Sequence, residues 1–150
     1  MSTQVDVDGL DATEKLSRMI IASPHYKQLR VVMLNGVTLG GFNVVDIKAL
    51  NSKTGLPIIA ITTRKPDLAK VRAALKNLPN FEDRWNAILN AGEIFPVATH
   101  GGMQQVYVEV SGLAKETAVE ILELTATRSK TPEPLRVAHL VASGISLYTT

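Results

Sequence analysis

The sequence predicts one α/β domain over residues 1–150, with a mostly parallel sheet as the middle of three layers and helices on both faces. Two observations support this fold class. Short β-rich runs alternate along the chain with segments of helical periodicity. Residues 29–34 and 57–62 are apolar almost throughout, which is typical of strands that are covered on both faces.

The composition excludes several classes of protein. Hydrophobic residues make up 45% of the chain and the net charge is only +2, so we expect a folded core rather than disorder. The sequence has no cysteine, which rules out disulfides, a thiolate nucleophile and cysteine-based metal sites. The apolar runs are too short to span a bilayer, and residues 1–15 are too acidic for a targeting signal. We therefore expect a cytoplasmic protein with no membrane partner.

The N-terminal half is expected to place strands and helices around the two apolar runs. Residues 3–7 form a predicted short strand. A helix begins at Asp11, because Glu14 three residues later completes a variant of the capping box. Asn43 is the expected cap of a second helix, which Gly55 ends.

The C-terminal half is expected to be mainly helical, with one further strand. Apolar residues recur at helical spacing in four segments, and one segment alternates between apolar and polar residues as a half-exposed strand does. The predicted helices cover residues 68–78, 81–89, 115–127 and 133–143, and the predicted strand covers residues 104–110.

Polar side chains follow the predicted strands of the first half. Asp8 comes after the first strand, Asn35 after the second, and Arg64 and Lys65 come after the third. Since ligands bind at the carboxyl ends of parallel strands, we expect these groups to share one rim. A carboxylate and an amide with cations nearby suit a hard metal ion and an anionic substrate. Asp8 and Asn35 each precede a glycine, however, and such pairs are also common turn dipeptides.

Two polar residues lie on the otherwise apolar last helix. His139 is on the same face as Arg136, three residues earlier. A lone histidine among apolar residues is most often a core residue with one hydrogen bond. A buried arginine, in contrast, requires an anion or a carboxylate beside it, so the pair indicates a site or a buried ion-pair network. The predicted substrate-binding residues are Gly36, Arg64, Lys65 and Arg136.

Several of these segments together resemble the archaeal endonuclease dU family. The resemblance is carried by residues 7–14, 30–47 and 54–57, and above all by the run Pro-Glu-Pro-Leu-Arg-Val-Ala-His-Leu at residues 132–140. That family is related to endonuclease V, so the resemblance implies a ribonuclease H-like fold. It also implies a Mg²⁺-dependent endonuclease that cuts DNA beside a deaminated base, such as uracil or inosine, during repair.

The resemblance further implies roles for single residues. Asp8 matches the acidic residue of an acidic-Gly step, Asn35 stands where the family usually has aspartate, and His139 matches the histidine of the terminal motif. These three are the implied catalytic residues. Asp8 and Asn35 are the implied ligands of Mg²⁺, for which Mn²⁺ can substitute. Asp46 adds a further ligand if its helix turns it inward.

Two departures from the family pattern predict that cleavage is weakened or lost. The amide of Asn35 brings no charge to a metal ion. The sequence also begins near the family's third strand, without the strands that precede it and the catalytic aspartate they carry. We expect a rearranged sheet or a homo-oligomer that covers the open strand edge. The alternatives are a non-catalytic relative that binds nucleic acid, DNA rather than RNA, through Arg64 and Lys65, and an oligomeric structural protein.

Overall fold

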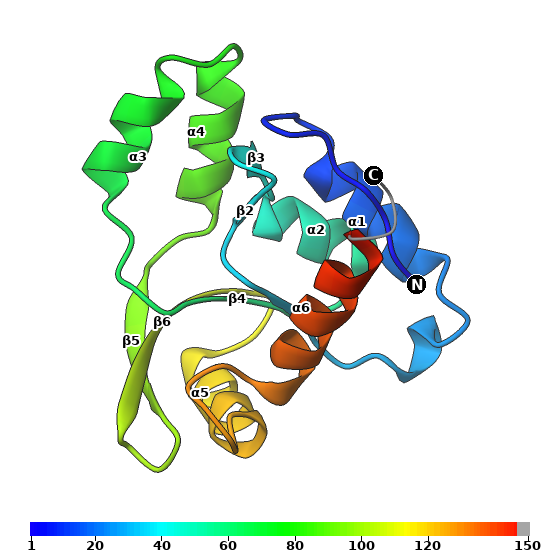
Figure 1. The fold of residues 1–150 in the computed structure, drawn as a ribbon, viewed down its shortest axis with the longest axis vertical. Helices are drawn as coiled ribbons and strands as arrows, with labels where there is room; N and C mark the ends of the chain where they lie inside the picture. The colour runs from blue at the N-terminus through cyan, green and yellow to red at the C-terminus, as the bar shows by residue number, and fades with distance from the viewer. Residues whose placement is uncertain (147–150) are drawn as a thin grey trace.

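A four-stranded sheet with the strand order β1-β4-β6-β5 forms the centre of the molecule, in a computed structural model that describes residues 1–146 (Figure 1). The strands are β1 (Val32–Leu34), β4 (Ile58–Thr62), β5 (Phe95–Thr99) and β6 (Gln104–Ser111). β1 pairs with β4 in parallel, whereas the β4–β6 and β5–β6 pairs are antiparallel. The sheet is therefore mixed rather than mostly parallel, because β5 and β6 are joined as a hairpin.

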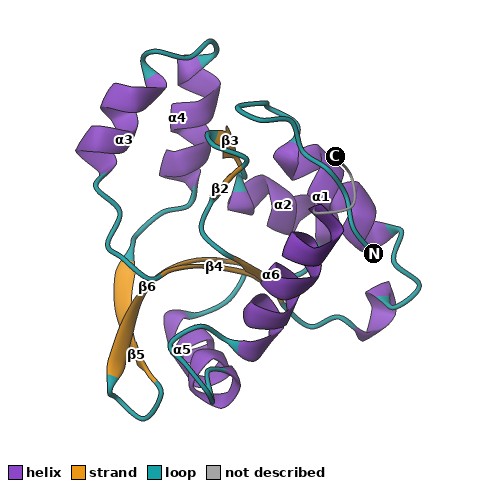
Figure 2. Ribbon diagram, in the orientation of Figure 1, coloured by secondary structure: helices purple, strands orange, loops and turns teal. Residues whose placement is uncertain are grey.

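Helices cover both faces of this sheet, as predicted (Figure 2). Alternate residues of a strand point to opposite faces of the sheet, so the residues of β4 contact the helices on both faces. Ile58 and Ala60 pack with α1 (Ala12–Ile21) and α2 (Ile47–Thr54). Ile59 and Ile61 pack with α5 (Lys115–Thr125), and on the same side Leu135 brings in α6 (Glu133–Ser146). The α/β fold class with helices on both sides of the sheet is confirmed.

A helical hairpin of α3 (Leu68–Leu75) and α4 (Phe81–Asn90) lies between β4 and β5 in the sequence and stands to one side of the sheet (Figure 1). It packs on a two-stranded β-hairpin, β2 (Thr38–Leu39) and β3 (Asn43–Val44), through Val44, Leu75 and Ile88. A short 3-10 helix, η1 (Tyr26–Gln28), precedes β1. The predicted helices are thus present, but β5 and the β2–β3 hairpin were not expected from the sequence.

Asn43 does not cap α2, and this prediction was wrong. Asp46 is the cap instead, because its Oδ1 accepts a hydrogen bond of 2.9 Å from the backbone N–H of Ala49. Gly55 ends α2 as expected, in the left-handed conformation with φ 67°. Asn43 lies in β3, where its Oδ1 accepts a hydrogen bond of 3.0 Å from the backbone N–H of Ala12, at the start of α1.

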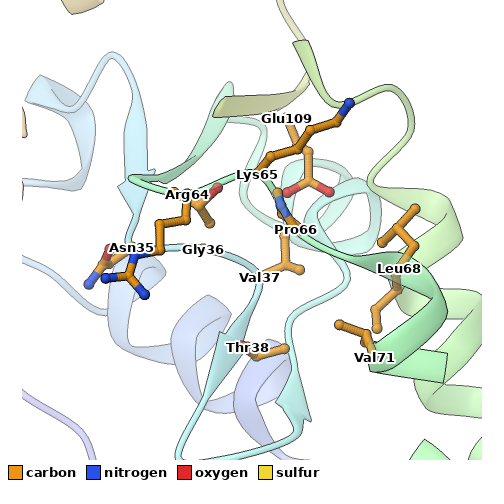
Figure 3. A pocket seen from close by; sticks show the side chains of 12 residues that line it. Asn35, Gly36, Val37, Thr38, Arg64, Lys65, Pro66, Leu68, Val71 and Glu109 are labelled. Atoms are coloured by element: carbon orange, nitrogen blue, oxygen red, sulfur yellow. The ribbon is translucent and has the colours of Figure 1, made fainter. Parts of the chain in front are cut away.

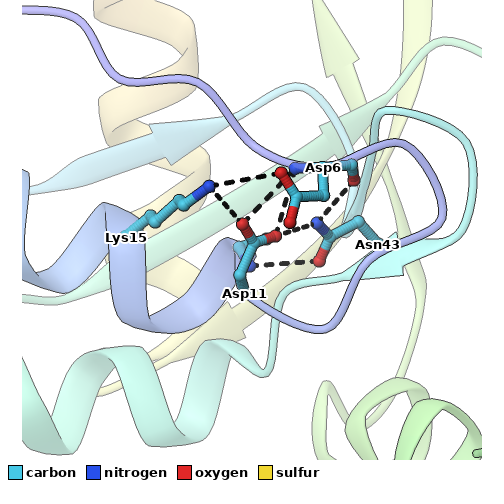
Figure 4. Close-up of polar contacts among 5 residues, drawn as sticks. Asp6, Asp11, Lys15 and Asn43 are labelled. Carbon is cyan, nitrogen blue, oxygen red and sulfur yellow. Dashed lines mark hydrogen bonds and ion pairs between the residues drawn. The ribbon is translucent and has the colours of Figure 1, made fainter.

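Residues 3–7 form no strand, so this prediction was wrong. Side-chain contacts hold the segment around Asp6 in place instead (Figure 4). Asn43 donates to the backbone oxygen of Asp6 over 2.9 Å and also donates to the carboxylate of Asp11. The hydrogen bonds from Lys15 and Asn43 lower the pKa of Asp11 to about 2. Asp11 therefore ties residue 6 to the β2–β3 hairpin, and its side chain makes no capping hydrogen bond to α1.

None of the helices in the described part of the chain is both long enough and apolar enough to cross a membrane.

Candidate functional site

Asn35 directly follows β1 and lies between two hollows in the surface. The first, which we call the Glu109 pocket, has a volume of about 300 Å³ (Figure 3). The second, which we call the His139 pocket, has a volume of about 270 Å³. The Glu109 pocket is lined by Asn35, Gly36, Val37, Thr38, Thr62, Arg64, Lys65, Pro66, Leu68, Val71, Ile88 and Glu109. The His139 pocket is lined by Asn35, Thr63, Ser129, Thr131, Leu135, Arg136 and His139.

The parallel pairing of β1 with β4 explains why distant segments meet here. β1 ends at Leu34, which lies opposite Ala60, and β4 continues in the same direction to Thr62, so the residues that follow the two strands reach the same edge of the sheet. Asn35 thereby comes to share a pocket with Arg64 and Lys65, as the strand-end argument predicts. Gly36 is buried there in the left-handed conformation, with φ 77°.

The C-terminal helix α6 brings the second part of the predicted set to Asn35. Arg136 and His139 both line the His139 pocket together with Asn35. His139 is exposed, so the alternative of a buried core histidine does not hold. Arg136 is paired within its own helix, since its Nε and Nη2 donate to Glu133 Oε2 over 3.0 and 2.8 Å. This ion pair lowers the pKa of Glu133 and supplies the carboxylate that a half-buried arginine requires.

Asp8 is not brought into either pocket. It sits in a turn with φ 52°, and its Oδ1 accepts a hydrogen bond of 2.7 Å from the backbone N–H of Phe42. Its own backbone N–H donates to the oxygen of Gly40 over 2.8 Å. Because residues 3–7 form no strand, Asp8 does not stand at the carboxyl end of a strand, and the expected shared rim does not include it.

A buried arginine fixes the turn that contains Asp8. Arg84 of α4 is only 2% exposed, and its guanidinium donates to the backbone oxygens of Asp8 and Gly9 over 2.6 and 2.9 Å. It also donates to the oxygens of Phe42 and Pro79 over 2.6 and 3.0 Å. Arg84 thus joins three segments through carbonyl groups alone, although a helical pattern at residues 81–89 does not indicate this role.

The described side chains do not fit a Mg²⁺ ion beside Asn35. Within residues 1–146 no group of three or more His, Asp or Glu side chains could hold a metal ion. The Asp8 carboxylate is bound to the Phe42 amide, and the Asp46 carboxylate caps α2 and accepts 2.7 Å from Asn90 Nδ2. One other residue with a carboxyl group lines the same pocket as Asn35, and the strand-end pattern does not predict it.

That residue is Glu109, which lines the pocket from β6 (Figure 3). It is paired in register with Ala60 of β4 and is 4% exposed. Burial raises its pKa to about 7 from an ordinary value of 4.5. The alternating pattern of β6 assigns Glu109 to the polar side of a half-exposed strand, and no local pattern indicates that this side is covered.

Comparison with known proteins places these residues in a family. Residues 1–146 match the family model described as Endonuclease dU. A UPF0215 protein of Methanosarcina acetivorans is 49% identical over 97% of this chain and 74% of its own length. A UPF0215 protein of Methanopyrus kandleri is 45% identical over 97% of this chain and 74% of its own.

A solved structure has the same fold. The crystal structure of a protein of unknown function from Archaeoglobus fulgidus superposes with a TM-score of 0.87 at 38% sequence identity. The match covers 95% of this chain and 79% of that one. The chain therefore spans about three quarters of the length of these relatives.

Proposed function

Because the chain belongs to the endonuclease dU family, we propose that it is a nuclease-type protein that binds DNA with a deaminated base, such as uracil or inosine, in repair. Metal-dependent cleavage by this chain is weak or lost. The observation that carries the proposal is the position of Asn35 between two pockets, with Arg64 and Lys65 on one side and the Arg136 end of α6 on the other.

The charges around Asn35 support nucleic-acid binding. Arg64 and Lys65 are exposed among the residues that line the Glu109 pocket, and their head groups point to opposite sides of it (Figure 3). Lysine and arginine side chains of this kind neutralise backbone phosphates and release counterions, which makes binding dependent on salt. His139 is exposed in the other pocket that Asn35 lines, where Arg136 also lies.

The side chains at the expected metal position support weak or absent cleavage. Mg²⁺ prefers charged oxygen ligands, and Asn35 offers a neutral amide where the family pattern has a carboxylate. The Asp8 carboxylate is engaged by the backbone N–H of Phe42. These two observations favour the non-catalytic, DNA-binding relative as the second candidate function.

The test combines binding and cleavage on the same oligonucleotides. Uracil- and inosine-containing DNA and the matching RNA are titrated with protein at low and moderate salt, then incubated with Mg²⁺ or Mn²⁺. We expect salt-dependent DNA binding, little cleavage by the wild type and more cleavage by Asn35→Asp. The matched control is Asn77→Asp, which adds the same charge at an exposed position that lines neither pocket.

Each outcome decides one part of the proposal. Absence of DNA binding at low salt would refute it altogether. Efficient cleavage by the wild type would show that the neutral amide at Asn35 does not weaken the reaction. Binding without cleavage by either protein would support the non-catalytic candidate.

A further inference from the structure

The Glu109 pocket contains a buried carboxyl group that the proposed DNA-binding surface does not use. Glu109 is 4% exposed, and no hydrogen bond or ion pair to another described residue satisfies its carboxyl group. Its oxygens nevertheless face the pocket (Figure 3). Because the carboxyl oxygens are open to the pocket and make no bond to a described residue, a ligand in the pocket can pair with them.

The walls of the pocket are apolar and come from three different elements. Val37 lies on the loop after β1, Leu68 and Val71 are on α3, and Ile88 is on α4. With a volume of about 300 Å³, the pocket is at the small end of the range for ligand sites. A double helix cannot enter such a space, but one flat ring system can.

The other charges that line the pocket are positive, which disfavours a cationic ligand. Arg64 and Lys65, both from the loop after β4, are the other charged side chains among the described residues that line the pocket. The residues that α3, α4 and the loop after β1 contribute are uncharged. In Figure 3 the ammonium group of Lys65 points away from the carboxyl of Glu109. The pocket therefore combines apolar walls and one ionisable carboxyl with positive charge at its mouth.

The raised pKa gives Glu109 both kinds of hydrogen-bonding group near neutral pH. Burial is its cause, and about half of the molecules hold the protonated acid at pH 7. A carboxylic acid can donate one hydrogen bond and accept another. It can therefore pair with the edge of a ligand ring that has a hydrogen-bond acceptor and a donor side by side. The ring edge of uracil, with its N–H and C=O groups, is such an edge.

We infer that the Glu109 pocket binds a single unpaired nucleobase, whose donor–acceptor edge pairs with Glu109 while its phosphate stays at the mouth of the pocket, where Arg64 and Lys65 supply positive charge. The inference rests on the proposed DNA-binding function and specifies which part of the substrate enters this site. Glu109 is then a specificity-determining residue rather than a metal ligand.

The test compares two small probes that differ only in the base. Deoxyuridine 5′-monophosphate and 2-deoxyribose 5-phosphate are titrated into labelled protein, and the NMR signals of the Glu109 side chain and the Val37 methyls are followed. We expect the nucleotide to bind at least 10-fold more tightly than the sugar phosphate at pH 6. This preference should decrease as the pH rises through about 7, because the carboxylate loses its donor.

Two variants and a control separate the contribution of Glu109 from an effect on folding. Glu109→Gln keeps the shape and both hydrogen-bonding groups, so it should retain the preference for the nucleotide and lose the pH dependence. Glu109→Val should remove most of the preference while leaving sugar-phosphate binding unchanged. Glu82→Gln changes an exposed glutamate of α4 and should behave as the wild type.

The same proteins, tested with a DNA oligonucleotide, distinguish failure of this inference from failure of the proposed function. DNA binding together with equal affinity for the two small probes would overturn the nucleobase pocket and leave the proposed function standing. Selective nucleotide binding without any DNA binding would refute the proposed function and support the pocket. A Glu109→Val protein that keeps the wild-type preference would also overturn the inference.

Discussion

Replacing Glu109 with glutamine should make the protein more stable at neutral and alkaline pH. The native state holds this carboxyl where burial raises its pKa to about 7 from an ordinary value of 4.5. The unfolded chain therefore ionises more readily than the native state between these two pH values. The free energy of unfolding of the wild type should accordingly fall as the pH rises from about 4.5 to about 7, and then level off. The uncharged amide of Glu109→Gln has no such dependence.

The size of the effect follows from the change in pKa. At about 1.4 kcal/mol for each pH unit, the change from 4.5 to about 7 corresponds to about 3 kcal/mol. Water that enters the open pocket reduces the cost of the charge, so we expect about 2 kcal/mol between wild type and variant at pH 8. At pH 4 the wild-type carboxyl is protonated in both states, and the two proteins should differ little.

Urea unfolding at pH 4, 6 and 8 measures this difference, since all other titrating groups are common to the two proteins. Glu82→Gln is the control for the loss of a carboxylate on the surface, and it should follow the wild type at each pH. If wild type and Glu109→Gln show the same dependence of unfolding free energy on pH, Glu109 is charged without penalty. The reasoning from its burial would then be wrong.

Three further predictions concern the cations and the exposed face of α6. Arg64→Ala should weaken DNA binding and lower the salt slope by about one, whereas Lys27→Ala, which changes an exposed cation on η1, should do neither. Arg84→Met should lower the free energy of unfolding by about 2 kcal/mol, because partly buried carbonyl groups lose their donors; an unchanged urea midpoint would contradict this. Leu140, which is 57% exposed on α6 near Val137, is expected to lie in a homo-oligomer contact. Light scattering should then give a smaller mass for Leu140→Glu than for the wild type, and equal masses would oppose this interface.

Local signals in the sequence predicted the elements that depend on neighbouring residues. The apolar run around β4 and the glycine stop of α2 at Gly55 both depend on residues within one element, and both are found. Asn43 was misassigned because its hydrogen-bond partner, Ala12, is 31 residues away. β5 is missed because its exposed residues, Pro96 and Ala98, are not polar and so hide the alternation, and its pairing with β6 makes it a strand. Side chains whose partners are distant in sequence cannot be assigned from a local pattern.

The same distinction explains which part of the candidate site could be predicted. Asn35 and Arg64 were found because each closely follows one of two strands that pair in parallel, and the ends of such strands meet. Asp8 was expected beside them for the same reason, but residues 3–7 pair with no strand, so its position carries no such consequence. Glu109 lies within an antiparallel strand, and only the loop after β1 and the α3–α4 hairpin turn its side of the sheet into a pocket. The positions of strand ends therefore predict the residues at the mouth of this pocket, such as Asn35 and Arg64. The position of Glu109 inside the pocket depends instead on which segments cover that face of the sheet.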